Sequence, residues 1–309
     1  MKRKLLIIGS NGMVGSALLR IAKKRSSYKI LYPNRKKLDL KKFNQIINYL
    51  NKYKPDVIVN CAAMVGGVNS NNTKPAQFIY NNLTIQTNLI HAAYKCNIKK
   101  FIFLGSSCIY PRISKQPIKE DYLLSGKLEK TNEPYAVAKI AGIKMCESYR
   151  REYGCNFVSV MPTNLFGYND NFDEYDSHVM PALIRKFAEA KQNNKNEIKI
   201  WGTGKPKREF LFVDDLARAI LIIDKKYNQP SPINVGFGKD ISIKDLAYKL
   251  KKLFKYNGKI KFNTNFPDGT PRKLLNVKKI KKLGWEPKIS LEAGLIKTMN
   301  WYNKTFIKN

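Results

Sequence analysis

Three glycines directly after a short apolar segment near the N-terminus constrain the fold of this chain more than any other feature. Residues 4–8 suit a buried strand, and the glycines follow it at intervals of three residues. Glycines at such a turn let the backbone approach a pyrophosphate and bring the next helix, expected over residues 16–24, against the strand. The sequence therefore predicts a strand, loop and helix that bind a dinucleotide. The residues of this loop are Gly9, Ser10, Asn11, Gly12, Met13, Val14 and Gly15.

Apolar segments that alternate with helical patterns extend this unit into an α/β fold. Such alternation is typical of a doubly wound parallel sheet, the Rossmann fold, whose ligands lie at the carboxyl ends of the strands. Further strands are expected at residues 28–32, 55–63, 101–105, 156–161 and 233–236, and helices at residues 41–51, 75–97 and 135–152. His91, inside the helix at 75–97, is interpreted as structural.

The second half of the chain contains no linker and no internal repeat, so we expect a smaller C-terminal α/β domain that interlocks with the first. Residues 208–217 are expected to return to the main sheet. The other predicted elements are helices at 179–190 and 243–255, strands at 195–201 and 259–262, and a helical tail. The predicted division gives residues 1–165 and about 209–237 to a dinucleotide-binding domain, and about 166–208 and 238–309 to a substrate domain.

The segment after the second expected strand indicates which dinucleotide binds. An enzyme that uses NAD places Asp or Glu there for the ribose 2′-hydroxyl. This chain has Pro33, Asn34, Arg35, Lys36 and Lys37 instead. A cationic cluster suits the 2′-phosphate of NADP, and Arg35 is the best single candidate to bind it. The alternative is that these are further examples of the lysines found throughout the chain.

Tyr135 and Lys139 lie one helical turn apart on the helix expected after Pro134. An ammonium at that spacing is expected to lower the tyrosine pKa from its usual value of about 10. Such a tyrosine can pass a proton to a ketone oxygen as hydride arrives at its carbon. Ser106, at the end of the strand at 101–105, could hydrogen-bond the same oxygen. A solvated surface pair is the alternative for Tyr135 and Lys139.

The formal charge of +34 raises the alternative of a basic nucleic-acid-binding protein. The lysines are spread through every segment rather than gathered in a patch, which favours a general compositional bias. Five cysteines without a C-x-x-C motif and only two histidines argue against a metal site and favour a reducing cytoplasm. No apolar run approaches the ~20 residues that span a membrane, and the N-terminal run is too short for a signal peptide.

With these pieces in place, the chain resembles the extended short-chain dehydrogenase/reductases and, within them, the GDP-L-fucose synthase family. The similarity runs nearly from end to end. Its most specific motifs are SSCIYP, within the matching segment at 104–111, and SHV at 177–179. The other matching segments are residues 9–15, 61–67, 131–139, 160–165, 170–172, 208–210, 213–215 and 267–275. The loop around Arg35 is a looser match, which leaves the cofactor preference less well supported than the fold.

The resemblance implies NADPH-dependent epimerisation of a GDP-linked 4-keto-6-deoxy sugar at C3 and C5, followed by reduction at C4. Cys108 and His178 match the family's pair of proton-transfer groups; for Cys108 alone, a small buried residue is the alternative. Ser106, Tyr135 and Lys139 match the reductase triad. The GDP-sugar would contact Lys186, Trp201, Arg208 and Asp268. Further cofactor contacts would come from Leu40, Leu104, Gly105, Ser107, Lys139, Pro162, Thr163, Asn164, Leu165 and His178.

The sequence does not decide which GDP-sugar is the substrate. A related enzyme of the GDP-colitose or GDP-deoxyheptose pathway would carry the same catalytic residues, because the sugar substituents are recognised by loops whose shape the sequence does not give. The helices at 75–97 and 135–152 resemble those through which the family forms dimers, so a homodimer is expected.

Overall fold

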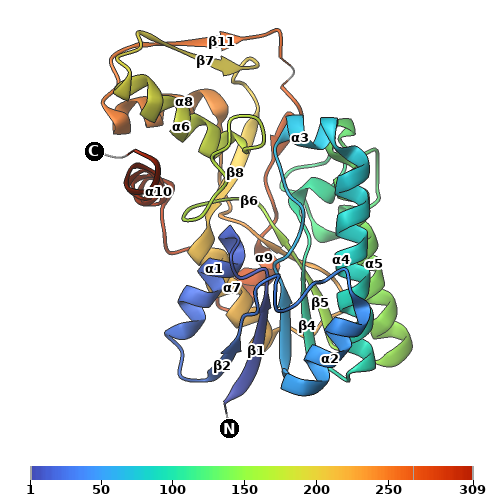
Figure 1. Ribbon diagram of the computed structural model, residues 1–309. Helices are drawn as coiled ribbons and strands as arrows, with labels where there is room; N and C mark the ends of the chain where they lie inside the picture. Colours follow the sequence, from blue (N-terminus) through green and yellow to red (C-terminus); the bar gives the residue numbers. More distant parts are fainter. Residues whose placement is uncertain (1, 267, 308–309) are drawn as a thin grey trace.

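The structure, a computed structural model, describes residues 2–266 and 268–307 and has two parts of unequal size (Figure 1). The larger part contains a six-stranded sheet with helices on both faces, and the smaller part lies at the carboxyl ends of its strands. Pro267, which belongs to one of the matching segments, lies outside the described residues. Among the described helices, none combines the length and apolar character needed to cross a bilayer.

The predicted parallel sheet is confirmed. Its strands run in the order β2-β1-β3-β4-β5-β9, and every neighbouring pair is parallel. The chain leaves β1 toward β2 on one side and then crosses to β3 on the other, which places the ligand-binding switch point between β1 and β3. The strands are β1 (Arg3–Ile8), β2 (Tyr28–Leu31), β3 (Val57–Asn60), β4 (Lys100–Leu104), β5 (Phe157–Pro162) and β9 (Ile233–Val235).

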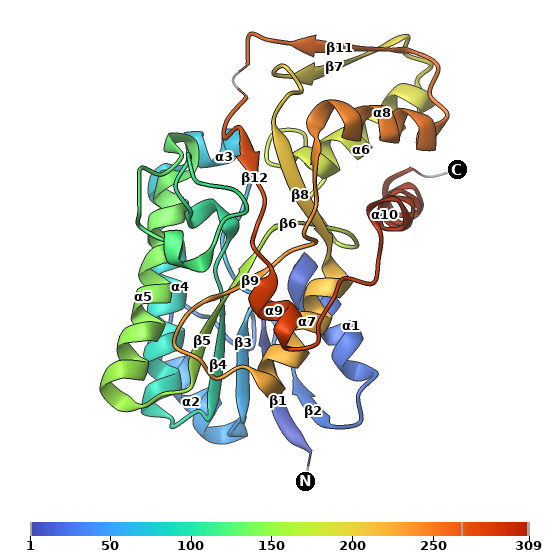
Figure 2. The ribbon, with the colours of Figure 1, turned by 180° about the vertical axis from the view of Figure 1, so that it is seen from behind.

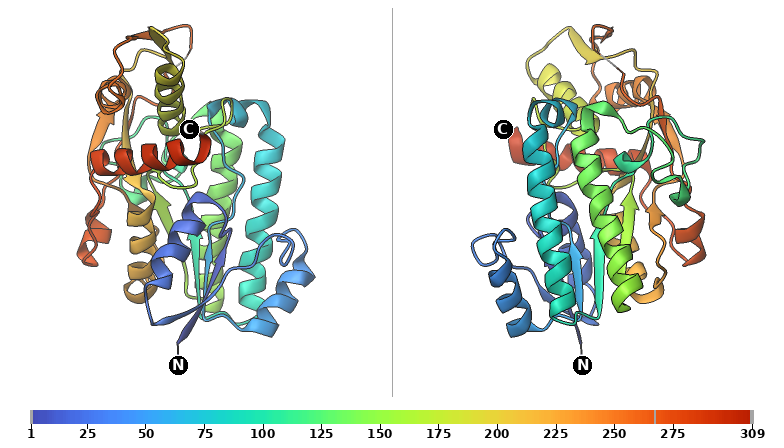
Figure 3. Two further views of the ribbon diagram at one scale, coloured as in Figure 1. Left: turned by 60° about the vertical axis from the view of Figure 1, so that its left-hand side comes forward. Right: turned by 90° about the vertical axis from the view of Figure 1, so that its right-hand side faces the viewer.

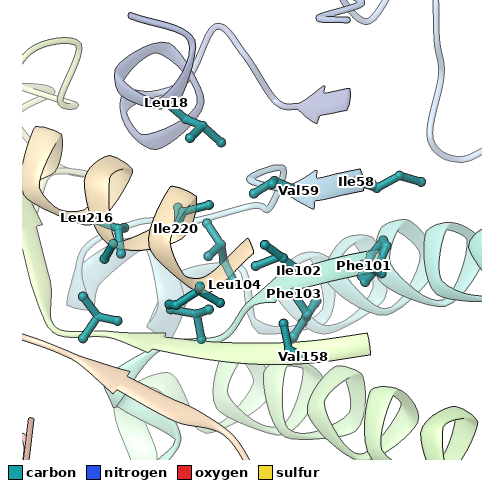
Figure 4. Close-up of a cluster of buried hydrophobic side chains, with 14 of the residues drawn as sticks. Leu18, Ile58, Val59, Phe101, Ile102, Phe103, Leu104, Val158, Leu216 and Ile220 are labelled. Atoms are coloured by element: carbon teal, nitrogen blue, oxygen red, sulfur yellow. The ribbon is translucent and has the colours of Figure 1, made fainter. Parts of the chain in front are cut away.

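Helices cover both faces of this sheet, as apolar parallel strands require. Helices α1 (Met13–Lys23) and α7 (Val213–Lys226) pack together on one face. Figure 4 shows Leu18 of α1 and Leu216 and Ile220 of α7 against strand residues such as Val59 and Ile102, all buried. The opposite face carries α2 (Phe43–Tyr53), α4 (Pro75–Lys95) and α5 (Glu133–Tyr153).

His91 lies among aromatic side chains where α2, α4 and α5 meet, away from the carboxyl ends of the strands. Its Nδ1 is 2.7 Å from the Tyr149 hydroxyl, and its ring lies 5.5 Å from that of Phe43. This setting agrees with the structural interpretation.

The smaller part is built on a second sheet and a two-stranded ribbon. Strand β8 (Lys207–Phe212) pairs with β10 (Asp240–Ser242), β12 (Arg272–Lys273) and β6 (Asn164–Phe166), while β7 (Glu197–Trp201) pairs with β11 (Lys259–Asn263). Its helices are α6 (Val179–Gln192), α8 (Ile243–Phe254) and α10 (Leu291–Phe306). Two short helices, α3 (Val68–Thr73) and α9 (Lys278–Lys282), pack against the larger part, α3 against α4 and α9 against β9 (Figures 1 and 2).

Two sequence expectations were wrong here. Residues 208–217 do not return to the main sheet, because β8 lies in the second sheet and α7 begins at Val213. The carboxylates of Asp214 and Asp215 in the first turn favour that helix start. Helix α1 begins at Met13 rather than residue 16, because Gly12 already serves as its N-cap.

Two separate hydrophobic cores underlie the two parts. The first surrounds the six-stranded sheet, and the second lies between β8 and the helices α6, α8 and α10. Leu275, Val277, Ile280 and Trp285 join the first core, although the predicted division gave them to the substrate domain. The two-domain division therefore stays a proposal, with residues 275–285 packing against the larger part.

Candidate active site

The glycine loop after β1 has the geometry that an anionic dinucleotide needs. Gly9 has a φ of +78°, and a Cβ there would lie 2.8 Å from the backbone nitrogen of Ala62 at the end of β3. A Cβ at Gly15 would overlap the Gly9 carbonyl oxygen, whereas at Gly12 the nearest atom would be 3.6 Å away. Since α1 has no side-chain cap and no acidic residue in its first turn, its N–H groups are available to a phosphate.

The loop after β2 carries the predicted cationic cluster on the surface. Arg35, Lys36 and Lys37 are exposed on a turn closed by Asn34, whose side-chain oxygen accepts a hydrogen bond from the Lys37 N–H at 3.0 Å. Leu38 anchors the turn in the first core. No acidic residue lies between the end of β2 and residue 38, so the loop fits a 2′-phosphate better than a bare ribose.

Most of the remaining predicted cofactor residues lie at the ends of β4 and β5 or in β6, and Leu40 lies between β2 and α2. Leu104, Gly105 and Ser107 are buried, and the Gly105 N–H donates to the Val160 carbonyl at 2.8 Å. Thr163 and Asn164 bond to the backbone oxygen of Glu209 at 3.2 and 2.9 Å. Pro162 is buried and Leu165 half-buried, and the Leu40 carbonyl accepts from Asn88 at 3.0 Å.

Tyr135 and Lys139 lie on one face of α5 as predicted, but the expected pKa shift was wrong. Burial raises the pKa of Tyr135 well above 10, the nearby Cys108 adds to this, and a hydrogen bond from Ser106 opposes it. The Lys139 ammonium donates instead to the Leu104 carbonyl at 2.8 Å, and lies 5.9 Å from the centre of the tyrosine ring. Burial also lowers the Lys139 pKa to about 8.

Cys108 lies in a short helical turn directly after β4, where cations surround its sulfur. Burial alone would raise its pKa, but Lys273, a hydrogen bond with Ser106 and the guanidinium of Arg208 together lower it. The Ser106 hydroxyl also accepts from the Cys108 N–H at 3.2 Å. Because Cys108 in turn raises the pKa of Tyr135, the structure brings these catalytic candidates into one site.

His178 is the N-cap residue of α6 and approaches the same site from the smaller part. Two effects lower the pKa of His178: first the loss of hydration caused by the surrounding protein, and then the charge of the Lys273 ammonium. The side chain of His178 is nevertheless exposed. The preceding residues are held by the loop at 64–67. The Gly67 N–H donates to the Asp176 carbonyl at 2.8 Å, and a Cβ on Gly67 would overlap the Ser177 carbonyl oxygen.

The four predicted substrate contacts lie in different parts of the site. Arg208 is close enough to Cys108 for each to shift the pKa of the other. Lys186 and Trp201 lie together farther out, with the lysine 5.6 Å from the centre of the indole ring. The outer aromatic pair is completed by Phe266, stacked 4.3 Å from Trp201. Asp268 uses both carboxylate oxygens on Thr203, each at 2.7 Å, so in this structure it fixes the turn after β7.

Sequence reasoning missed two residues of this site. Lys273 on β12 places its Nζ 3.5 Å from the Cys108 sulfur. Glu209, fully buried, accepts from the Gly238 and Leu275 N–H groups at 2.6 and 3.0 Å and thereby holds β12 beside β8. Glu209 lies in the matching segment at 208–210 and Lys273 in the one at 267–275, so the family resemblance could have indicated both residues.

Comparison with known proteins agrees with this geometry. The model of the NAD dependent epimerase/dehydratase family matches residues 5–236. GDP-L-fucose synthase of Escherichia coli (strain K12) is 47% identical over 310 residues, covering 97% of each chain. The NADP-bound structure of a GDP-L-fucose synthetase from Naegleria fowleri superposes with a TM-score of 0.91 at 30% identity, covering 98% of this chain and 93% of that one.

A third relative is named for a different sugar. MlghC, a GDP-mannoheptose C4 reductase from Campylobacter jejuni with NADP bound, superposes with a TM-score of 0.89 at 36% identity and covers 98% of both chains. The fold and the nucleotide part of the ligand are therefore shared by relatives whose sugars differ.

Proposed function

The chain belongs to the NAD dependent epimerase/dehydratase family, and we propose that it converts GDP-4-keto-6-deoxy-D-mannose to GDP-L-fucose. The reaction inverts C3 and C5 and reduces the ketone at C4, with NADPH as the reductant. The observation that carries this proposal is the meeting of a thiol, Cys108, with a tyrosine, Tyr135: the Lys273 Nζ lies 3.5 Å from the Cys108 sulfur, and Cys108 and Ser106 are both close enough to Tyr135 to shift its pKa. The two chemistries need those two kinds of group. Similarity to GDP-L-fucose synthases over 97% of the chain supports the choice of substrate.

The nicotinamide cofactor would be held at the switch point of the sheet. The N–H groups at the start of α1 would bind the pyrophosphate, Gly9 and Gly15 keep the loop tight enough for that contact, and Arg35 would bind the 2′-phosphate. When bound, the cofactor supplies a hydride to C4 of the sugar. NADP-bound structures of relatives support the choice of NADP over NAD.

In the reduction, Tyr135 donates the proton that the C4 oxygen needs. The phenol is protonated at neutral pH, so the proton is present when the oxygen becomes negative; its raised pKa adds no acidity, because a phenol of higher pKa is the weaker acid. Ser106 lies beside it and can donate a hydrogen bond to the same oxygen. Lys139, anchored on the Leu104 carbonyl, keeps the end of β4 fixed against α5.

In the epimerisation, Cys108 removes protons and His178 supplies them from the opposite face. The C4 ketone acidifies the protons on both neighbouring carbons, so each inversion needs one base and one acid. A lowered pKa increases the thiolate fraction of Cys108 near neutral pH. The protonated imidazole of His178 is a stronger acid because its pKa is lowered, and the same shift reduces the protonated fraction near neutral pH.

The GDP part of the substrate would bind along the smaller part. Arg208 and Lys186 are the cations available for its diphosphate, and Arg208 can do so in bidentate fashion. Trp201 offers an exposed aromatic surface beside them. These assignments would place the diphosphate between the catalytic groups and the β7–β11 ribbon.

We also propose a homodimer formed through α4 and α5, which lie side by side on the outside of the larger part (Figure 3). Tyr80 of α4 and Val137 and Tyr153 of α5 are exposed large apolar side chains on this pair of helices. Burying them against a second copy would remove apolar surface from water.

Purified protein with NADPH and GDP-4-keto-6-deoxymannose, followed by NMR of the product, tests the function. We expect the proton couplings of GDP-L-fucose. A product reduced at C4 without inversion at C3 and C5 would contradict the epimerase assignment. If only a 3-deoxy or heptose nucleotide is consumed, the chain has the related colitose or deoxyheptose activity. Tyr135→Phe is the matched control for reduction.

A further inference from the structure

Lys273 reaches the reacting sulfur from a distant part of the chain. Its Nζ donates to the Cys108 sulfur at 3.5 Å, although 165 residues separate the two. Cys108 follows the central strand β4, whereas Lys273 ends the short strand β12 of the second sheet. In Figure 2, β12 lies between the smaller part and the loops that follow β4. This contact therefore joins the two parts of the molecule at the catalytic centre.

The backbone on either side of Lys273 is fixed by hydrogen bonds from both parts. Lys273 pairs with Arg208 in the β12–β8 register. The next two N–H groups, of Leu274 and Leu275, donate to Gln116 at 2.9 Å and to Glu209 at 3.0 Å. The Ile118 N–H donates to the Leu274 carbonyl at 2.7 Å. The ammonium is thus presented by a rigid segment rather than by a mobile loop.

The charges that face the Cys108 sulfur are cationic. Lys273 acts from β12 and Arg208 from β8, while Ser106 contributes a hydrogen bond. Tyr135 faces the sulfur from α5 as a neutral hydroxyl, and His178 at the start of α6 is close enough to Lys273 for its pKa to fall. The carboxylates of Glu129 and Asp268 act on Arg208.

The other four cysteines show how unusual this environment is. Burial raises the pKa of Cys61, Cys96, Cys146 and Cys155. All five thiols are free. Cys61 has one cation nearby, Lys139, and its pKa is still raised. Cys108 differs by having two cations, Lys273 and Arg208, of which Lys273 is in contact with the sulfur.

We propose that Lys273 is a positioning residue for epimerisation, whose ammonium holds the Cys108 sulfur in place as the thiolate that takes the proton from the sugar. This assignment rests on the function proposed above. In the step, the thiolate accepts a proton from C3 or C5 and becomes a thiol, and the electron pair of the broken C–H bond passes into the ketone-conjugated system. Lys273 keeps its own protons throughout, so it acts only through the sulfur.

Thiol alkylation without any substrate tests the contact directly. Iodoacetamide labelling of the peptide that contains Cys108 is followed by mass spectrometry between about pH 5 and about pH 9. In Lys273→Met, we expect labelling near neutral pH to slow by about tenfold or more, with the acid limb of the profile moved to higher pH, because a cation next to the thiolate is lost. Lys273→Arg keeps the charge and should retain most of the rate.

Lys278→Met is the matched control, because it removes the same charge from an exposed residue on the same segment. Its labelling profile should equal that of the unmutated protein. Equal thermal unfolding of all three variants would show that they fold. An unchanged labelling profile in Lys273→Met would overturn the proposal, and a raised KM for the GDP-sugar in that variant would then assign Lys273 to substrate binding.

Deuterium exchange at C3 and C5 in heavy water then links the contact to the reaction. In Lys273→Met, the exchange rate should fall by a factor similar to the fall in labelling rate, and the pH profile of exchange should shift to higher pH. Reduction of a ketone that is already bound should be less affected. Exchange at the unmutated rate and pH dependence would overturn the assignment to epimerisation. Absence of exchange in the unmutated protein would instead remove the proposed function, while the labelling result would still report on the contact between Lys273 and the sulfur.

Discussion

Gly67→Ala should impair epimerisation without touching any catalytic side chain. The Gly67 backbone has a φ of −67°, which any residue adopts, so the substitution carries no conformational penalty. The cost is steric, because the new Cβ would overlap the Ser177 carbonyl oxygen and lie 3.1 Å from its carbonyl carbon. Relieving the overlap requires residues 176–178 to move by roughly 1 Å, since both of these atoms are backbone.

The magnitude follows from two effects of that movement. The hydrogen bond from the Gly67 N–H to the Asp176 carbonyl is 2.8 Å long, and losing it with the overpacking would cost about 1–3 kcal/mol of stability. His178, the next residue after Ser177, would be displaced from the sugar. A displacement of about 1 Å can reduce a catalytic step by about 100-fold.

The assay separates the two chemistries. Deuterium incorporation at C3 and C5 should fall strongly, whereas hydride transfer should fall less, because Tyr135 and the glycine loop are not part of the displaced segment. Gly126→Ala is the control, since that glycine is exposed and its Cβ would meet only the Pro111 side chain, at 3.3 Å. Normal exchange in Gly67→Ala with unchanged stability would refute the view that the loop at 64–67 positions His178.

Three further substitutions test individual groups. Arg35→Ala should shrink the preference for NADPH over NADH in kcat/KM, and equal efficiency with both cofactors in the unmutated protein would contradict the 2′-phosphate argument. Tyr135→Phe should reduce the rate of ketone reduction by about 10²–10⁴-fold with exchange at C3 and C5 retained; a near-normal reduction rate would make Tyr135 a helix-face residue only. Cys108→Ser should abolish that exchange and yet allow slow reduction of the unepimerised ketone, which NMR of the product detects, whereas normal exchange would mean that the thiol only fills space.

Local patterns predicted most of the larger part of the fold. The apolar strands, the glycine loop and the helix with Tyr135 and Lys139 each depend on residues close in sequence, and the parallel sheet follows from their alternation. The boundary at Val213 was missed because residues 208–217 contain an apolar run with no break at the point where strand becomes helix. Strand β6 was missed because three residues are too few to show a period.

Contacts between distant segments could not be predicted from spacing. Lys273 lies 165 residues after Cys108, and only the β12–β8 pairing and the buried carboxylate of Glu209 bring it to the sulfur. The pKa of Tyr135 had the wrong expected sign for a similar reason. Helical spacing places Lys139 on the same face as Tyr135. It does not show how deeply Tyr135 is buried, nor that the Lys139 ammonium donates to the Leu104 carbonyl.

The site shifts the pKa values of Tyr135 and Cys108 in opposite directions, although burial alone would raise both. Removal from water raises the pKa of both a phenol and a thiol, so a pocket without fixed charge would keep Tyr135 and Cys108 both protonated. Lys273 and Arg208 act on the thiol and oppose that effect, while Lys139 is held away from the phenol by the Leu104 carbonyl. One proton donor and one proton acceptor can then coexist at the same pH, which is the condition for reduction and inversion to share one pocket.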